Sequence, residues 1–484
     1  MGALERFELR VDGEVISEGT RVVVREPWSG AALAEIVLAD AALADRAASA
    51  AVRAFEITRR SATHLRRELL RGVAQRIAVE RDAFAELLAR EAGKPIAQAR
   101  AEVARAVSTF ELASDEVSRA LGEVVPLDVT PAAAGYRGQW ARVPSGPVIA
   151  IAPFNFPLNL VAHKVAPALA VGASVVLKPP PQAPLSSLRL ARVVREVGEP
   201  LGVPAAALQV IPCEVPVAEA LVKDVRFRVF SFTGSDRVGW HLRDVAGKKR
   251  TLLELGGNAA AIVHDDAPLE RAADRITAGA FGYAGQVCIK VQRAIVHEAV
   301  LDRFLAMLIA RARAVTPMDP LDPAAVMSAM IDEANATRVE SWVDEARATG
   351  VTVVVGGARD RNRYPATVLA LSRGQGAGLR VVDEEVFGPV LVVQSYRTWD
   401  EALTLAGQTR FGLQCGIFTD SVARVRAAYD RLEVGGLVVG DIPTFRVDNM
   451  PYGGVRDSGL GREGVRFAME EMTEPKLLVW APTA

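Results

Sequence analysis

The pattern of apolar and polar positions divides the chain into a helical first part and a later part of alternating elements. Between residues 40 and 121, apolar residues recur every three or four positions among Ala, Arg, Glu and Leu. This spacing predicts several amphipathic helices. The helical pattern is broken at Gly93-Lys94-Pro95, a set of residues that favours a turn.

Further along, the pattern changes to short apolar runs separated by helical segments of ten or more residues. A first series of runs predicts strands at 148–152, 174–177, 209–211, 229–232 and 259–263. After Gly285 the alternation resumes, with strands predicted at 353–355, 391–393 and 437–439. Such alternation is typical of βαβ units around a parallel sheet. The sequence therefore predicts a doubly wound nucleotide-binding domain followed by a second α/β domain.

Composition and charge exclude several classes of protein. With 484 residues, of which 50% are hydrophobic and 24% charged, the chain is expected to be globular with two or three domains. A net charge of -1 gives no overall attraction to nucleic acid or to acidic membranes. No uncharged apolar stretch is long enough to span a bilayer, and the first six residues lack the apolar stretch of a signal peptide. A cytoplasmic protein is expected.

The cysteines and histidines indicate free thiols rather than a metal centre. Cys213, Cys288 and Cys415 lie far apart, without the spacing of a disulfide framework or of a structural zinc site. The five histidines are scattered, and none pairs with another at helical spacing. Metal catalysis is therefore not expected.

One carboxylate and one thiol stand in two segments rich in glycine. Glu254 precedes Gly256-Gly257 at the predicted end of a strand, and Cys288 follows Gly285 in a loop that we expect to lead into a helix. A thiolate attacks a carbonyl carbon, and a nearby carboxylate then activates water to break the acyl-sulfur bond. The alternatives are a cysteine that packs as a small apolar side chain and a glutamate held in a salt bridge.

Seven ordered segments, these two among them, resemble the signature segments of the aldehyde dehydrogenase superfamily over essentially the whole chain. The other five are Pro153-Phe154-Asn155-Phe156-Pro157-Leu158-Asn159, Leu177-Lys178-Pro179, Phe232-Thr233-Gly234-Ser235 with Gly239, Glu384-Glu385-Val386-Phe387-Gly388-Pro389 and Met450-Pro451-Tyr452-Gly453-Gly454. Any one of these segments alone is a weak signal, but their joint order is specific. Lactaldehyde and succinate-semialdehyde dehydrogenases are the members that the chain resembles most in type.

The resemblance implies a reaction and three catalytic residues. Cys288 would attack an aldehyde, and Asn155 with the backbone amide of Cys288 would stabilise the oxyanion of the thiohemiacetal. Loss of hydride to NAD or NADP would leave a thioester, which water activated by Glu254 would hydrolyse to the carboxylic acid. Without the resemblance, an Asx turn is the simpler interpretation of Asn155.

The resemblance also implies a cofactor site. Lys178 would hold the adenosine ribose, Gly234 and Ser235 would begin the helix that takes the pyrophosphate, and Glu385 with Phe387 would hold the nicotinamide end. The full set of expected cofactor-binding residues is Phe154, Lys178, Gly234, Ser235, Gly239, Gly256, Glu385 and Phe387. Solvated charges are the alternative for the lysine and the glutamate.

One departure from the family pattern bears on the choice between NAD and NADP. Many NAD-preferring relatives have a glutamate three residues after the lysine, whereas this chain has Pro181 there. A carboxylate would repel a 2′-phosphate, and proline does not. The segment resembles that of NADP-using non-phosphorylating glyceraldehyde-3-phosphate dehydrogenases, so acceptance of NADP is expected.

Three residues are candidates for binding the substrate. In relatives that act on anionic aldehydes, arginines in contexts similar to those of Arg105 and Arg446 grip a carboxylate or phosphate. His163 is a third candidate for the same cavity. The alternatives are surface arginines and a histidine packed within a helix. Val287 stands where relatives with phosphorylated substrates often have arginine, so a short substrate such as succinate semialdehyde or lactaldehyde is expected.

The resemblance implies a division of the chain and an oligomer. We expect an NAD(P)-binding domain at 1–122 and 145–256, a catalytic domain at 257–456 and a small β oligomerisation segment at 123–144 and 465–484. Residues 135–143 alternate loosely and could pair with a partner's edge strand, which implies a dimer or tetramer. The alternative functions are a CoA-acylating semialdehyde dehydrogenase, which needs no glutamate base, and a cysteine hydrolase without a cofactor.

Overall fold

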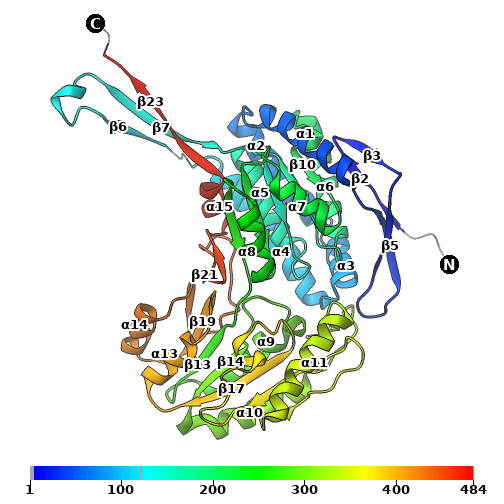
Figure 1. Ribbon diagram of the computed structural model, residues 1–484, viewed down its shortest axis with the longest axis vertical. Helices are drawn as coiled ribbons and strands as arrows, with labels where there is room; N and C mark the ends of the chain where they lie inside the picture. Colours follow the sequence, from blue (N-terminus) through cyan, green and yellow to red (C-terminus); the bar gives the residue numbers. More distant parts are fainter. Residues whose placement is uncertain (1–4, 120–121, 483–484) are drawn as a thin grey trace.

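The computed structural model describes residues 5–119 and 122–482 of the chain (Figure 1). Residues 1–4 lie outside the described residues, and they make up most of the six-residue start in which we expect no signal peptide. Residues 120 and 121 at the end of the predicted helical region, and the last two residues of the chain, also lie outside the described residues.

Four helices fill the predicted helical region. They are α1 (Ala41–Thr58), α2 (Thr63–Val79), α3 (Arg81–Ala92) and α4 (Ile96–Glu116). The side chain of Asp40 caps α1 by accepting a hydrogen bond from the backbone N–H of Leu43 at 2.8 Å. Gly93 takes a left-handed conformation (φ +63°) that ends α3, and Pro95 precedes α4. The predicted helices and the break between them are confirmed.

Short strands that the pattern did not predict precede these helices. β1 (Glu5–Phe7), β4 (Arg21–Arg25) and β5 (Ala32–Val37) form a three-stranded sheet, and β2 (Leu9–Val11) pairs with β3 (Glu14–Ile16). Most of them are only three to five residues long and interleave charged residues with apolar ones. Such short segments give little periodic signal.

A six-stranded sheet forms the centre of the first α/β unit. Its order is β10-β9-β8-β11-β12-β22, and all strands are parallel except β22. The strands are β8 (Val148–Ile151), β9 (Val175–Lys178), β10 (Leu208–Val210), β11 (Val229–Thr233), β12 (Arg250–Glu254) and β22 (Gly459–Leu460). Its helices are α5 (Asn159–Val171), α6 (Leu185–Gly198), α7 (Val215–Lys223) and α8 (Asp236–Val245). The chain builds outward from β8 to β10 and then returns to the other side of β8, which creates a topological switch point between β8 and β11.

A seven-stranded sheet forms the second α/β unit, which is the lower body in Figure 1. Its order is β15-β16-β17-β14-β13-β19-β20, and only β15 is antiparallel to its neighbour. The strands are β13 (Ala260–Val263), β14 (Arg293–His297), β15 (Thr352–Val355), β16 (Thr367–Ala370), β17 (Val390–Tyr396), β19 (Gln414–Phe418) and β20 (Gly436–Val439). The run 259–263, which the pattern grouped with the first series, thus belongs to the second sheet.

Helices cover the second sheet, and short elements connect the two units. The helices are α9 (Leu269–Phe281), α10 (Leu301–Ala314), α11 (Glu333–Ala348), α12 (Arg380–Asp383), α13 (Trp399–Gly407) and α14 (Val422–Arg431), and the two-residue strands β18 (Phe411–Gly412) and β21 (Val455–Arg456) pair with each other. Helix α15 (Val465–Glu471) instead packs against α5 and α4 of the first unit. Within the described residues, no helix is both long and apolar enough to cross a membrane.

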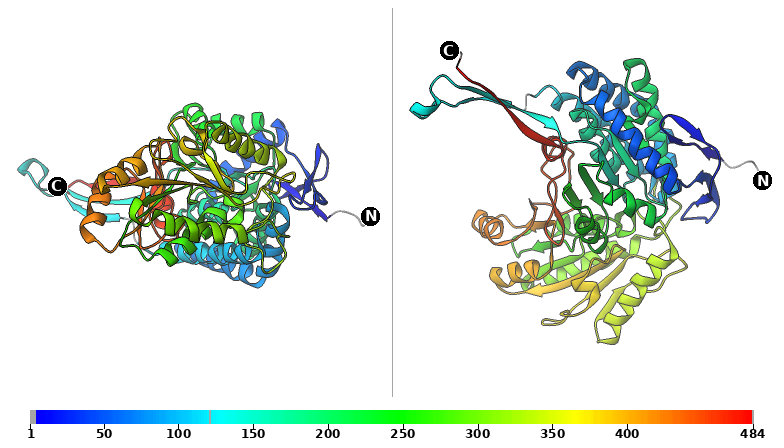
Figure 2. Two further views of the ribbon diagram at one scale, coloured as in Figure 1. Left: turned by 90° about the horizontal axis from the view of Figure 1, so that it is seen from below. Right: turned by 45° about the horizontal axis from the view of Figure 1, so that its top comes forward.

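A three-stranded antiparallel arm projects from the body of the molecule in every view (Figures 1 and 2). It consists of β6 (Gly122–Pro126), β7 (Arg137–Pro144) and β23 (Thr473–Trp480), in the order β23-β7-β6. The segment that we expected to pair with a partner's edge therefore pairs with the C-terminal strand of its own chain. The arm leaves apolar side chains in solvent, and Trp480 is 60% exposed.

Candidate active site

Cys288 lies in a tight loop between α9 and β14. The turn Gly282–Gly285 before it holds Tyr283 and Ala284 at positive φ (52° for each). A Cβ on Gly285 would collide with the carbonyl oxygen of Gly388, so this turn requires glycine. The loop leads into the strand β14, so the predicted helix after Cys288 is wrong.

Burial and one hydrogen bond set the state of this thiol. Burial raises the pKa of Cys288 to about 11, whereas the hydroxyl of Tyr452, 3.1 Å from Sγ, and the charge of Arg446 act to lower that pKa. The thiol can become a nucleophile only when its proton is removed or when the surroundings change during substrate and cofactor binding.

Glu254 ends β12, as the pattern predicted, and only 4% of the residue is exposed. Within the described residues its Oε2 has no hydrogen-bond partner. Burial raises the pKa of its carboxyl group well above the ordinary value, and the negative charge of Glu463 raises the pKa further. A carboxyl group with a raised pKa and a free oxygen is suited to general-base work.

Backbone contacts bring Asn155 and the turn after Glu254 to the Cys288 loop. The side-chain amide of Asn155 donates a hydrogen bond to the carbonyl of Gln286 at 3.0 Å. The second N–H of that amide remains for another acceptor. A Cβ on Gly257 would lie 2.6 Å from the carbonyl oxygen of Cys288, so the turn packs directly on the backbone of Cys288.

A cavity of about 220 Å³ opens onto Cys288. Both arginines that the sequence singled out line it, together with Tyr452, polar side chains of α4 and α5, and apolar residues of α5 and α9. Neither arginine is a surface charge. Arg105 is 28% exposed and donates to both oxygens of Asp448, at 2.6 and 3.3 Å.

Arg446 is more deeply placed. Its Nη2 donates to Glu463 at 3.0 Å, and its guanidinium carbon lies 3.7 Å from the centre of the Tyr452 ring. Its Nε has no hydrogen-bond partner among the described residues. Each arginine is therefore neutralised by one buried carboxylate while it keeps N–H groups for a ligand.

His163 lies behind the cavity rather than on its wall. Its Nε2 is 2.8 Å from Asp448, and the side chain is completely buried within α5. Burial lowers the pKa of this imidazole, which favours the neutral ring. These contacts match the alternative of a packed helix histidine that orients Asp448.

The predicted cofactor residues lie at the carboxyl ends of the first sheet, close to its switch point. Lys178 is the last residue of β9. Gly234 and Ser235 follow β11, and Ser235 precedes α8, whose first N–H groups receive no cap from its side chain. A Cβ on Gly239 would collide with Leu255, so glycine lets α8 approach the sheet closely.

Glu385 reaches the same region from the second unit. It accepts a hydrogen bond from the N–H of Gly257 at 3.0 Å, and a Cβ on Gly256 would collide with its carboxylate. Phe387 (φ +45°) packs edge to face against Phe154 at 5.8 Å. A cradle that requires glycine, an uncapped helix start and a nearby carboxylate fit a dinucleotide.

Sequence reasoning missed four polar residues of this site. Tyr452 belongs to the signature segment Met450–Gly454, but the sequence assigned it no function. Asp448 lies two positions after Arg446 and was not considered as a partner of an arginine. Glu463 and Lys164 form a buried pair at 3.2 Å that joins Arg446 to α5. Because 299 residues separate the two, no local pattern indicates that they pair. The one available signal is that Glu463 lies in a short charged segment between two glycines, Gly461 and Gly464.

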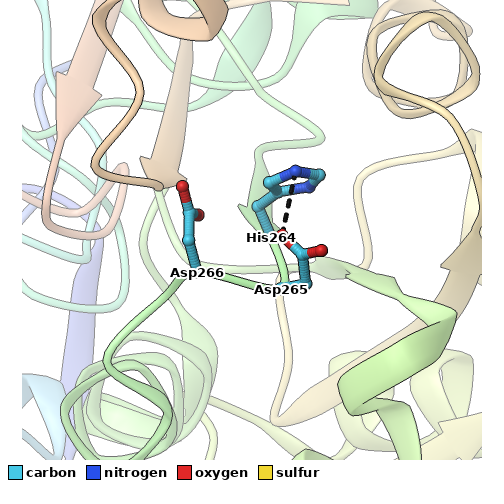
Figure 3. Close-up of side chains that lie close together, drawn as sticks. All are labelled: His264, Asp265 and Asp266. Carbon is cyan, nitrogen blue, oxygen red and sulfur yellow. Dashed lines mark ion pairs between the residues drawn. The ribbon is translucent and has the colours of Figure 1, made fainter.

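A group of possible metal ligands lies away from this cavity. His264, Asp265 and Asp266 follow β13, and Figure 3 shows the imidazole facing Asp265 while Asp266 points elsewhere. Asp266 is bonded to Thr419 at 2.9 Å and paired with Arg424 at 3.3 Å. Because β13 and β14 are parallel, this group lies at the sheet edge opposite the loop that carries Cys288.

The fold and site define an α/β oxidoreductase in which a cysteine thiol lines a cavity near the carboxyl ends of a doubly wound sheet. Residues 15–478 match the aldehyde dehydrogenase family, and the chain belongs to this family. It is an NAD(P)-dependent aldehyde dehydrogenase, as the resemblance implied.

Similar proteins cover nearly the whole chain. A 3-sulfolactaldehyde dehydrogenase of Priestia megaterium is 38% identical over 477 residues, which are 98% of each chain. The structure of aldehyde dehydrogenase 21 from Physcomitrella patens with the product succinate aligns with a TM-score of 0.96, at 35% identity over 99% of each chain. The structure of the glyceraldehyde-3-phosphate dehydrogenase GapN from Methanocaldococcus jannaschii with NADP aligns with a TM-score of 0.92, at 35% identity over 96% of this chain and all of that one.

Proposed function

We propose that this enzyme oxidises a short aldehyde with a distal anionic group to the corresponding acid, with Cys288 as nucleophile, Glu254 as base and Asn155 as oxyanion donor. The observation that carries the proposal is one cavity that holds the Cys288 thiol together with Arg105 and Arg446. An anion-binding end and a nucleophile within one small cavity define both the reacting atom and the length of the substrate.

In the proposed mechanism the Cys288 thiolate forms a bond to the aldehyde carbon. The carbonyl oxygen becomes an oxyanion, which accepts hydrogen bonds from the free amide N–H of Asn155 and from the backbone N–H of Cys288. The oxyanion then re-forms a carbonyl, and the carbon loses its hydrogen with the bonding electron pair. The product of this oxidation is a thioester on Cys288.

Glu254 then acts on water. Its carboxylate takes a proton from a water molecule, whose oxygen adds to the thioester carbon, and the carbon–sulfur bond breaks to release the acid and the thiolate. The raised pKa of Glu254 makes proton transfer from water more favourable than with an ordinary carboxylate. This base argues against the CoA-acylating alternative, in which CoA would take the acyl group.

The residues proposed to hold the cofactor are Phe154, Lys178, Gly234, Ser235, Gly239, Gly256, Glu385 and Phe387. When bound, the nicotinamide supplies the acceptor for the hydride. Burial raises the pKa of Glu385 to about 7, so a hydrogen bond from a ribose hydroxyl would favour its charged form. NADP as well as NAD is proposed, because Pro181 places no carboxylate near the 2′ position and a similar structure holds NADP.

The proposed substrates are 3-sulfolactaldehyde and succinate semialdehyde, and lactaldehyde, which has no anionic group, is the alternative. The first is supported by the name of a relative and the second by the succinate bound to a similar structure. Sulfonate and carboxylate groups both accept hydrogen bonds from the N–H groups that Arg105 and Arg446 leave free. Since His163 does not line the cavity, we propose that it acts through Asp448 rather than by touching the substrate.

We further propose the domain division 1–122 with 145–256, 257–456, and 123–144 with 465–484. The exposed apolar side chains of the arm support a homodimer or homotetramer in which a second copy covers them. A cytoplasmic location is part of the same proposal.

An aldehyde panel with both cofactors tests the function. Absorbance of the reduced nicotinamide should rise with 3-sulfolactaldehyde or succinate semialdehyde at least ~10-fold faster, in kcat/KM, than with butanal. Added CoA should not accelerate the reaction, and no thioester of CoA should appear. Equal rates with charged and neutral aldehydes would overturn the substrate proposal, and CoA-dependent turnover would favour the acylating alternative.

A further inference from the structure

A buried ion pair that the proposed mechanism does not use joins Lys94, in the turn between α3 and α4, to Glu102 of α4. Lys94 and Glu102 are both fully buried, and the ammonium group of Lys94 donates to the carboxylate of Glu102. Transfer of two charges out of water is costly unless other groups satisfy them. The contacts of these two side chains with the active-site loops indicate what the pair does.

Glu102 holds the end of the loop that carries Asn155. Its Oε1 accepts hydrogen bonds from the backbone N–H groups of Leu158 at 3.0 Å and Asn159 at 3.1 Å. These are the N–H groups at the start of α5, where a negative charge is favourable. The carboxylate therefore fixes the point at which this loop turns into α5.

Lys94 touches both loops of the site through aromatic rings. Its Nζ lies 3.5 Å from the centre of the Phe156 ring and 4.7 Å from the centre of the Tyr283 ring. Phe156 directly follows Asn155, and Tyr283 belongs to the strained turn before Cys288. The hydroxyl of Tyr283 also donates to the carbonyl of Ala92 at 2.9 Å, which ties that turn to the end of α3.

We propose that Lys94 and Glu102 are positioning residues that hold the Asn155 loop and the Cys288 loop at a fixed separation. The inference rests on the proposed roles of Asn155 and Cys288. An oxyanion donor works only when it lies about 3 Å from the oxygen that becomes charged, and a displacement of about 1 Å can cost on the order of 100-fold in rate. The rings of Phe156 and Tyr283, one from each loop, pack edge to face at 6.3 Å, and a cation in contact with both rings holds this arrangement.

Two reactions of the same thiol, measured without cofactor, separate positioning from a general structural role. The burst of p-nitrophenolate from p-nitrophenyl acetate reports acylation of Cys288, which forms an oxyanion. Alkylation of Cys288 by iodoacetamide displaces iodide and forms none. A loss of folded protein changes both rates equally, whereas a displaced Asn155 lowers only the acylation rate.

The main variant is the double substitution Lys94→Met with Glu102→Gln. It removes both buried charges together and leaves the Gln oxygen to accept from Leu158 and Asn159, so that no unpaired charge remains. We expect the ratio of acylation to alkylation to fall by at least ~10-fold. Tyr283→Leu changes no charge and removes one of the two rings that Lys94 contacts, so it should lower the ratio in the same direction and decides the matter if the double variant does not fold.

Glu91→Gln is the matched control. Glu91 is a buried carboxylate that accepts the N–H groups of Leu185 at 2.7 Å and Ser186 at 2.9 Å at the start of α6, and it bonds to neither active-site loop. Its substitution should leave the ratio within ~2-fold of wild type. A wild-type ratio in a folded double variant, or in Tyr283→Leu, would overturn the proposal, and so would an equal fall in Glu91→Gln. Wild-type rates of both reactions in Cys288→Ala would instead refute the proposed role of Cys288.

Discussion

The hydroxyl of Tyr452 lies 3.1 Å from the sulfur of Cys288, although 164 residues separate them in the chain. The contact joins the Cys288 loop to the segment that also carries Arg446, whose guanidinium stacks on the same phenol ring. The Cys288 thiol, the phenol that is hydrogen-bonded to it and a cation of the cavity therefore form one packed group.

This contact leads to a prediction on pH. Because burial raises the pKa of Cys288 to about 11, the thiolate is a minor species at pH 7 and grows about tenfold for each pH unit below the pKa. Alkylation of Cys288 in the cofactor-free enzyme should rise through pH 10 without a plateau. In the wild-type enzyme the hydrogen bond with Tyr452 lowers the pKa of Cys288 and so favours the thiolate. Tyr452→Phe removes this bond and should therefore slow alkylation at pH 9 by roughly 10-fold.

Tyr396→Phe is the control for this experiment, because its buried hydroxyl contacts His264 at 2.7 Å instead of the thiol. Its alkylation profile should match that of the wild-type enzyme. A plateau below pH 8.5 in the wild-type profile would show that the free thiol is activated in the absence of cofactor.

Gly256→Ala should weaken cofactor binding. The added Cβ would collide with the carboxylate of Glu385, which must then leave its bond to the N–H of Gly257. We expect the KM for NADP and NAD to rise by about 10-fold or more, on the scale of a lost charge-assisted hydrogen bond. Gly407→Ala, where a Cβ meets its first neighbour at 4.0 Å, should leave both values unchanged. Unchanged cofactor KM values in Gly256→Ala would remove Glu385 from the cofactor site.

Pro181→Glu should shift the cofactor preference. A carboxylate at this position would repel a 2′-phosphate, so the ratio of kcat/KM for NADP to that for NAD should fall by at least ~10-fold. The wild-type enzyme should use NADP at no less than about a tenth of its efficiency with NAD. Initial rates with both cofactors at fixed aldehyde concentration measure this, and strict NAD dependence of the wild type would refute the prediction.

Arg105→Gln should reduce the advantage of anionic aldehydes. Its guanidinium lines the cavity and keeps N–H groups free beyond its pair with Asp448, so kcat/KM for succinate semialdehyde should fall by roughly 10- to 100-fold. The value for butanal should change little. Arg275→Gln, which breaks a similar pair with Asp441 outside the cavity, should affect neither substrate. An equal loss with both aldehydes in Arg105→Gln would assign Arg105 to structure alone.

The local pattern was sufficient to predict the strand ends at which two candidate site residues lie. Lys178 and Glu254 both follow apolar runs, and runs followed by proline or glycine predict where a parallel strand stops. The same reasoning predicted a helix after Cys288, and this prediction was wrong. The glycines before Cys288 form a strained turn, and the segment after it leads into the strand β14.

Contacts between distant segments could not be predicted. The pairing of β7 with β23 and the pair of Lys164 with Glu463 each join residues about 300 positions apart. Hydrophobic periodicity reports which face of an element is buried but not which element covers it. For this reason the sequence did not reveal the carboxylates that neutralise Arg105 and Arg446. Exposed surface positions therefore remained an alternative interpretation for both arginines.

The most direct test of the account is the state of Cys288 in Glu254→Gln during turnover. The enzyme is mixed with NADP and succinate semialdehyde, quenched with acid on the millisecond scale, and the Cys288 peptide is weighed by mass spectrometry. The account predicts a burst of NADPH close to one per active site, a Cys288 peptide heavier by the acyl group, and slow release of acid. An unmodified Cys288 peptide, or a burst slowed as much as the steady state, would contradict it.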